Sequence, residues 1–302
     1  MSTLSRQDSD SESRLNAVVD RIRDAVSIVT TGWMGTIGFV IIVLIVLLAV
    51  FAPFIAPYSP TAENFSAQYR SPSAAHPLGT DNHGRDVLSQ IIFASRPAIL
   101  IGITTSLGVT LLGTSIGVLA GYYGGYTDDL LMRLVDFTYG LPLLPFLIIS
   151  VALFKPSMPI IVLSMILILW RGVARVIRSH VLTLKEKPYI KSIRASGASN
   201  GRIILYHIVP NVLPLTFLYG SFAIGWAILT SANLAFLGFG DPTVLSWGKM
   251  LLLARQNQVL LVGAWWWFFP PGVMIMLLVA SVFAVGRAAE SAINPEISEE
   301  AV

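Results

Sequence analysis

The sequence predicts an all-helical integral membrane protein with about six membrane spans. Of its 302 residues, 54% are hydrophobic and only 12% are charged, whereas a soluble domain has roughly 25% charged residues. The mean hydropathy is +0.71, and several apolar stretches approach the about 20 residues that a helix needs to cross a bilayer. A water-soluble fold would lack enough polar surface to cover this much apolar material, so that class is excluded.

The first 33 residues are expected to form a cytoplasmic tail and an amphipathic helix. Residues 1–13 are rich in Ser, Asp and Glu, which is typical of disorder, and they lack the features of a signal peptide. Between residues 15 and 29, apolar residues recur at helical spacing among charged ones. That pattern indicates a helix that either lies on the membrane surface or packs against the protein's own cytoplasmic face.

The first span is expected at residues 34–56, closed by Pro53 and Pro57. A polar loop follows at residues 58–97, and the second span covers residues 98–121. Within it, Gly113, Gly117 and Gly121 repeat at four-residue spacing. Because small residues let two backbones approach closely in lipid, this spacing predicts a tight contact with another helix.

The third span is expected at residues 134–154, after the glycine-rich turn GYYGGYTDDLLMR. A tight turn at residues 155–159 leads into the fourth span at residues 160–176. Asp136 is the clearest charge inside a span, where charges often mark ion pathways. Its position one helical turn from Arg133 favours a structural ion pair instead.

Residues 184–214 form a basic island between the fourth and fifth spans. The island carries five basic residues before its histidine but only one acid, Glu186, and helix-forming sequence flanks Gly197. It is too long and too structured for a simple connecting loop. We therefore expect a helix–glycine–helix elbow that serves as a docking surface for a cytoplasmic partner.

The fifth span is expected at residues 215–237 and the sixth at residues 264–285, with a loop at 238–263 between them. Trp265, Trp266 and Trp267 open the sixth span, and tryptophan is enriched where a membrane meets water. This run predicts an interfacial anchor. The transmembrane domain then covers residues 34–295, and residues 296–302 are a C-terminal tail.

The distribution of Lys and Arg predicts the orientation. With both termini in the cytoplasm, 14 of the 20 Lys and Arg residues fall on the inside, as the positive-inside rule requires. The basic island is then cytoplasmic. The net charge of +3 is explained by this topology, so nucleic-acid binding is not expected.

Motifs for catalysis and metal binding are absent from the sequence. It has no cysteine, no phosphate-binding loop and no Gly-x-Ser-x-Gly elbow. His76 and His83 share a loop without a third ligand, which favours two solvated histidines over a metal site. Catalysis within the membrane is therefore not expected, no cofactor site is expected on this chain, and the energy source for transport is expected on another protein. An ion-coupled secondary transporter is the alternative, but the chain of buried acids that it needs is missing.

Four separated stretches resemble one family of transport proteins. The island, with YIKSIR at 189–194 and HIVPN at 207–211, resembles the cytoplasmic EAA loop of permease subunits from binding-protein-dependent ABC importers. HPLGTDNHGRDVLSQI, GYYGGYTDDLLMRLVDF and ANLAFLGFGDPTVLSWGKML, which begin at residues 76, 121 and 232, resemble the C-type permease of the dipeptide/oligopeptide branch, which includes nickel importers. The resemblance covers about residues 33–295, with the motifs in the expected order.

This resemblance implies a type I ABC importer permease fold and a set of ATPase-coupling residues. These are Tyr189, Lys191, Arg194, Ala195, Gly197, Ala198, His207 and Pro210. The family has Glu-Ala-Ala where this chain has Lys-Ser-Ile at 191–193, so an ammonium group replaces a carboxylate. Two alternatives stay open: the basic residues serve only membrane topology, and the glycine is an ordinary helix cap.

Two further groups of residues are candidates for function outside the island. The first is an external loop that either contacts a binding protein or partner permease, or is a self-contained turn held by Asp–Arg pairing. Its members are Gly79, Asp81, Gly84, Arg85 and Asp86. The second group either lines the outer mouth of the pathway or only ends the fifth span; its members are Gly238, Gly240 and Asp241.

The resemblance also implies the partners. They are a homologous second permease, one or two ATPase subunits that carry ATP and magnesium, an extracytoplasmic substrate-binding protein, and the lipid of the plasma or inner membrane. In that assembly the chain forms half of the pathway, and ATPase closure moves residues 189–207 to rock the spans. The implied cargo is a dipeptide or oligopeptide, and nickel complexes and sugars stay open.

Overall fold

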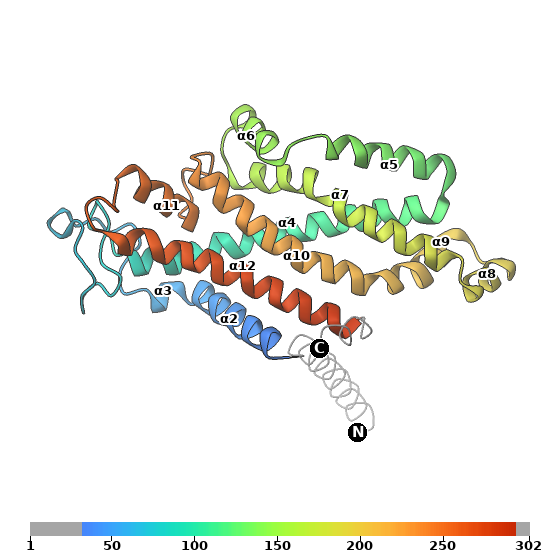
Figure 1. The fold of residues 1–302 in the computed structure, drawn as a ribbon, viewed down its shortest axis with the longest axis horizontal. Helices are drawn as coiled ribbons and strands as arrows, with labels where there is room; N and C mark the ends of the chain where they lie inside the picture. Colours follow the sequence, from blue (N-terminus) through green and yellow to red (C-terminus); the bar gives the residue numbers. More distant parts are fainter. Residues whose placement is uncertain (1–31, 294–302) are drawn as a thin grey trace, which may run out of the picture.

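A computed structural model describes residues 32–293, and all of its regular elements are helical (Figure 1). In chain order these are α2 (Trp33–Val50), α3 (Ala52–Ile55), the 3-10 turn η1 (Phe65–Ala67), α4 (Val87–Tyr123), α5 (Gly125–Tyr139), α6 (Leu143–Phe154), α7 (Met158–Lys185), α8 (Pro188–Ala195), α9 (Asn200–Ile203), the π-helical turn η2 (Ile204–Ile208), α10 (Val209–Phe236), α11 (Trp247–Gln256) and α12 (Trp265–Ile293). In this part of the chain five helices are long and apolar enough to cross a membrane, or six if the bent pair α5–α6 counts as one span. The predicted class and number of spans are confirmed. The amphipathic helix expected at residues 15–29 and the C-terminal tail lie outside the described residues.

The long helices run along the long axis of the molecule and define two ends (Figure 1). The loop between α3 and α4 gathers with α11 at one end, called here the loop end. Helices α8 and α9 project at the opposite end, called here the knob end. The fold therefore places the two sequence-predicted functional regions at opposite ends of the bundle.

The glycine stripe of α4 packs against α7, as its spacing predicted. A Cβ atom added at Gly113 would lie 2.7 Å from Cβ of Val173, and one added at Gly117 would lie 2.6 Å from the carbonyl oxygen of Ala174. At Gly121 the nearest atom would be Cβ of Val181, at 2.8 Å. Real side chains do not tolerate such distances, so the close approach of these two spans depends on glycine.

Three spans extend well beyond their predicted limits. Helix α4 begins at Val87 rather than near residue 98, because the Asp86 side chain caps it by accepting a hydrogen bond from the Ser89 N–H at 2.8 Å. Pro97 lies inside this helix without ending it. Helix α7 continues to Lys185, and α9, η2 and α10 form one continuous helix over residues 200–236.

The third predicted span is not one straight helix. Helices α5 and α6 meet at an angle of 85°. Pro142 lacks an N–H group and disfavours helical geometry in Leu141 before it, which ends α5 and starts a new helix. At the bend, the carbonyl oxygens of Thr138 and Leu141 accept hydrogen bonds from Nη1 of Arg171 on α7.

The predicted interfacial anchor at the start of α12 is wrong for two of its three tryptophans. Trp265 is exposed, but Trp266 and Trp267 are buried in the largest hydrophobic cluster. The indole N–H of Trp266 donates to the carbonyl oxygen of Thr80 at 3.2 Å. These side chains therefore attach α12 to the loop between α3 and α4, a partner that no neighbouring residue indicated.

Candidate functional site

The knob is residues 187–199, made of α8 and the turn that follows it. Helix α8 ends at Ala195, and Gly197 adopts a left-handed backbone with φ +82°. Its N–H donates to the carbonyl oxygen of Arg194 at 3.0 Å, and α9 begins at Asn200. This geometry is the predicted helix–glycine–helix elbow, and a left-handed residue at its centre favours glycine.

A hydrophobic core joins the knob to the membrane-spanning helices. Ile190 of α8 is fully buried and belongs to one cluster with Val181 of α7, Ile203 of α9 and Ile208 of η2. Tyr122, at the end of α4, lies in the same cluster. These side chains are packed together, so one continuous core extends from the knob into α4, α7 and α10.

Polar contacts add to this attachment. Nζ of Lys185 donates to the carbonyl oxygen of Gly121 at 2.8 Å, and the Tyr122 hydroxyl donates to Oδ1 of Asn200 at 2.9 Å. The Arg194 guanidinium lies 5.4 Å from the centre of the Tyr122 ring. Arg194 therefore faces its own chain, a contact that the sequence pattern did not indicate.

Lys191, which replaces the family's glutamate, forms an ion pair with Glu186. Its Nζ lies 2.9 Å from Oε2 of Glu186, and both side chains are exposed. The hydrogen bond and the charge of Lys191 hold the pKa of Glu186 below its usual value. The only acid of the island is thus engaged by the residue that departs from the family pattern.

His207 and Pro210 do not lie in the knob. Both belong to the continuous helix of residues 200–236, with His207 in the π-helical turn η2. Next to them, Leu205 and Tyr206 are exposed apolar side chains at the knob end, and Tyr189 is exposed on α8. Of the remaining predicted residues, Ala195 is exposed and Ala198 packs against the core of the knob. Leu205 and Tyr206 were missed because their sequence is indistinguishable from that of a span.

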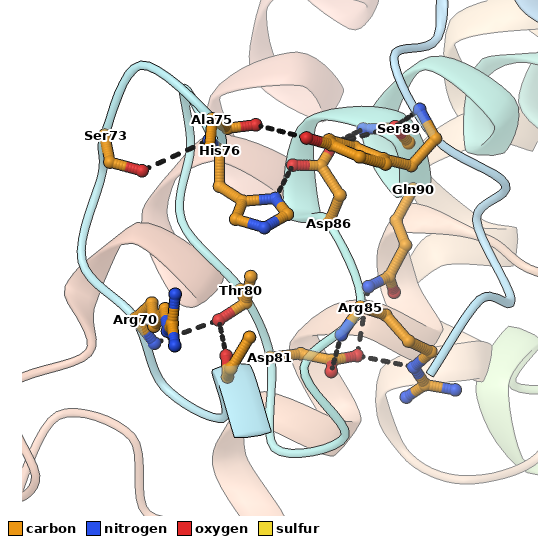
Figure 2. A network of polar contacts seen from close by, with 12 residues as sticks. Arg70, Ser73, Ala75, His76, Thr80, Asp81, Arg85, Asp86, Ser89 and Gln90 are labelled. Carbon is orange, nitrogen blue, oxygen red and sulfur yellow. Dashed lines mark hydrogen bonds and ion pairs between the residues drawn. The ribbon is translucent and has the colours of Figure 1, made fainter. Parts of the chain in front are cut away.

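A buried polar network organises the loop end, as Figure 2 shows. Asp81 is fully buried, and its carboxylate accepts hydrogen bonds from the N–H groups of His83 and Arg85 at 2.8 and 2.9 Å. It also accepts bonds from Nε of Arg85 at 2.7 Å and Nε2 of Gln90 at 3.0 Å. The Asp–Arg pairing considered as one alternative is therefore present.

The other predicted loop residues support the same interior. Asp86 lies 3.0 Å from Nδ1 of His76 while it caps α4 (Figure 2). Gly79 and Gly84 have φ +64° and +70°, and a Cβ at Gly79 would lie 2.6 Å from the Trp266 ring. Since both aspartates are buried, any partner at this end would contact their neighbours rather than the carboxylates.

Asp241 joins the loop after α10 to the start of α7. Its carboxylate accepts hydrogen bonds from the N–H of Met158 at 3.0 Å and from the N–H and hydroxyl of Thr243 at 2.8 and 2.6 Å. Gly240 lies against Ala235, and Gly238 has φ +94°. Burial raises the pKa of Asp241, but the hydrogen bonds outweigh it and leave the pKa below its usual value.

Comparison with known proteins places these features in a family. Residues 113–297, more than half of the chain, match the family described as the binding-protein-dependent transport system inner membrane component. This chain belongs to that family. Residues 33–72 also match the N-terminal transmembrane domain of oligopeptide transport permease C. The resemblance to C-type permeases is confirmed, and the chain is a transport subunit of a membrane permease.

Several permeases are similar to this chain over much of their length. The dipeptide transport system permease protein of Alkalihalophilus pseudofirmus is 33% identical over 276 residues, which cover 91% of this chain and 90% of the relative. The glutathione transport system permease protein of Pectobacterium atrosepticum is 36% identical over 68% of this chain and 69% of its own. The oligopeptide transport system permease protein of Bacillus subtilis is 31% identical over 76% and 75%.

The permease also contains a charged cleft that was not predicted. It lies between α7, α10 and α12 and has a volume of about 910 Å³. Asp136 lies near it and pairs with Arg175 of α7 at 2.7 Å, so its predicted pairing with Arg133 is wrong. Only the fold brings α5 alongside α7, and the i,i+3 spacing in the sequence pointed to the nearer arginine.

Proposed function

We propose that this chain is one of two homologous permease subunits of an ATP-driven importer for dipeptides and oligopeptides. It forms half of the translocation pathway and passes conformational change from ATPase subunits to that pathway. ATP and magnesium are held by the ATPases, so hydrolysis takes place outside this chain. Membership of the binding-protein-dependent family supports this role.

The single observation that carries the coupling role is the hydrophobic core of the knob. Ile190 is fully buried against residues that continue directly into α7 and α10. An ATPase that grips α8 therefore moves packed spans rather than a loose loop. The exposed side chains of Tyr189, Leu205 and Tyr206 offer the apolar contact surface.

The orientation follows from the same assignment. The knob end faces the cytoplasm, where ATPases are found, and the loop end faces the outside, where a binding protein delivers cargo. Both termini are then cytoplasmic. The excess of Lys and Arg in the segments predicted to be cytoplasmic, which include the knob, supports this orientation.

The cargo is assigned from the relatives. The names of these relatives specify dipeptides, glutathione and oligopeptides, all of which are peptides. We extend this class to the present chain in preference to nickel complexes or sugars.

Single-cysteine variants test the assembly cleanly because the chain has no native cysteine. Ser192→Cys lies on the exposed face of α8, and Glu63→Cys lies on the exposed loop end. Ser192→Cys should cross-link to a co-purified ATPase and resist an impermeant maleimide in intact cells, whereas Glu63→Cys should react with it. Val43→Cys, on the exposed side of α2, is the control that should cross-link neither to the ATPase nor to the binding protein. A chain that purifies alone and transports without ATP would overturn the proposal.

A further inference from the structure

An arginine lies at the middle of one span. Arg171 is 13 residues into α7, about 20 Å from either end of this 28-residue helix at 1.5 Å per residue. A charge at that depth is unfavourable in lipid and is normally found facing a water-filled cavity or a partner. Arg171 lines the cleft between α7, α10 and α12.

The Arg171 guanidinium is held in place but not saturated. Its Nη1 donates to the carbonyl oxygens of Thr138 and Leu141, and its Cζ lies 4.5 Å from the centre of the Tyr139 ring. Within residues 32–293 the structure shows no partner for its Nε and Nη2 groups. These two donors form the side of the guanidinium that binds a carboxylate in a bidentate manner.

The charge of the cleft is not balanced. Arg175 is paired with Asp136, while Arg287 and Glu290 both line the cleft near the end of α12. The two acids, Asp136 and Glu290, offset the charges of Arg175 and Arg287, and the positive charge of Arg171 is left in excess. An anionic group is therefore the ligand that the site favours.

Aromatic side chains supply the rest of the lining. Tyr219, Phe222 and Trp226 of α10 and Phe283 of α12 lie along the cleft, and the Trp226 side chain is exposed. The volume of about 910 Å³ is within the range of roughly 300–1,000 Å³ that small ligands occupy. The cleft thus suits a small molecule that combines one anionic group with apolar side chains.

We propose that this cleft binds peptide cargo in transit, with Arg171 holding the C-terminal carboxylate and the α10 aromatics contacting the peptide side chains. The inference rests on the proposed function, because it assigns a subsite to the importer's pathway. Every linear peptide carries a terminal carboxylate, so such a site accepts varied sequences. It also places the bound carboxylate beside the α5–α6 bend that Arg171 holds.

Competition for a photoreactive dipeptide tests the site without the binding protein. The purified complex is cross-linked to a dipeptide that contains benzoylphenylalanine, and a free-acid dipeptide and its C-terminal amide compete. For the unmodified complex, the acid should compete at a concentration at least about tenfold lower than the amide. In Arg171→Gln the acid and the amide should compete at equal concentrations, and in Arg171→Lys the acid should keep part of its advantage. The control Arg133→Gln lies on the exposed side of α5 and should keep the full advantage of the acid.

The acid-to-amide ratio is measured within each variant, so partial misfolding of Arg171→Gln does not imitate the expected result. Trp226→Ala, which removes an α10 aromatic side chain and leaves Arg171 in place, should weaken competition by both peptides equally. A ratio that survives in Arg171→Gln, in a complex that still imports dipeptides, overturns the subsite and leaves the proposed function intact. Competition by phosphatidylglycerol vesicles but not by the free acid assigns the cleft to lipid and also overturns it. If the unmodified complex imports no peptide at all, both the subsite and the proposed function are overturned.

Discussion

The carboxylate of Asp241 accepts a hydrogen bond from the N–H of Met158, the first residue of α7, at 3.0 Å. Ser157, which directly precedes this helix, makes no side-chain capping bond. The cap is therefore supplied by a residue 83 positions later in the chain. A negative charge at this place also interacts favourably with the N-terminal dipole of α7.

Asp241→Ala should lower the free energy of unfolding by about 1–3 kcal/mol, because the Met158 and Thr243 donors lose their acceptor. Thermal unfolding of the detergent-solubilised protein measures this change. Glu63→Ala removes an exposed loop acid and is the matched control. Equal stability of the two variants would contradict the capping role.

The contribution of Asp241 should also depend on pH. Its pKa in the folded protein is below the ordinary value of 3.8, so the ionised form stabilises the fold at every pH above that value. The contribution is lost as the pH falls through the folded-state pKa. We expect the difference in melting temperature between the native protein and Asp241→Asn to be constant from about pH 8 to pH 5 and to shrink below about pH 4. A difference that already shrinks between pH 7 and pH 5 would point to another titrating group.

Gly117→Ala should destabilise the bundle by about 1–3 kcal/mol, because the added Cβ would lie 2.6 Å from a backbone oxygen of α7 that cannot move alone. Gly272→Ala in α12 is the control, since a Cβ there meets no atom within 4 Å. Yield and melting temperature after purification report both effects. If the two variants behave alike, the α4–α7 contact does not depend on glycine.

Features encoded by neighbouring residues were predictable from the sequence. The four-residue glycine spacing in α4 predicts its close contact because one helix face determines how near another backbone can come. The elbow at Gly197 was predictable because glycine between two helix-forming segments favours a left-handed turn. The glycine stripe and the elbow could both be recognised from neighbouring residues, without knowing which helix packs against them.

Features that depend on distant partners were not predictable. Trp266 has the residue type and position of an interfacial anchor at the start of a span. It is nevertheless buried, and its indole N–H donates to the carbonyl oxygen of Thr80, 186 residues away. Asp136 has an arginine one turn away, yet the fold brings Arg175 closer. The cleft around Arg171 requires three helices to be placed together, which no single segment encodes.

Lys191→Glu should weaken association with the ATPase and leave the stability of the permease almost unchanged. The Lys191–Glu186 pair is exposed on both sides, so its loss has little effect on folding. Co-purification of the ATPase at rising salt concentration measures the docking effect. The double variant Glu186→Lys/Lys191→Glu restores the pair with reversed positions. Full recovery of docking in it would show that the pair itself, rather than the positive charge at position 191, is what the ATPase requires.

Gly197→Pro should abolish peptide uptake and leave membrane insertion intact. Proline fixes φ near −65° where the knob requires +82°, and it removes the N–H that donates to Arg194. Gly201→Ala is the matched control, because a Cβ there meets no atom within 4 Å and the residue is helical. Uptake of a labelled dipeptide and stimulation of ATPase activity by the binding protein, both in proteoliposomes, report coupling directly. We expect Gly197→Pro to lose uptake and stimulation together, by at least about tenfold, since the strained turn would displace α8 from the core around Ile190. Normal uptake by this variant would show that the elbow does not transmit ATPase closure to the spans.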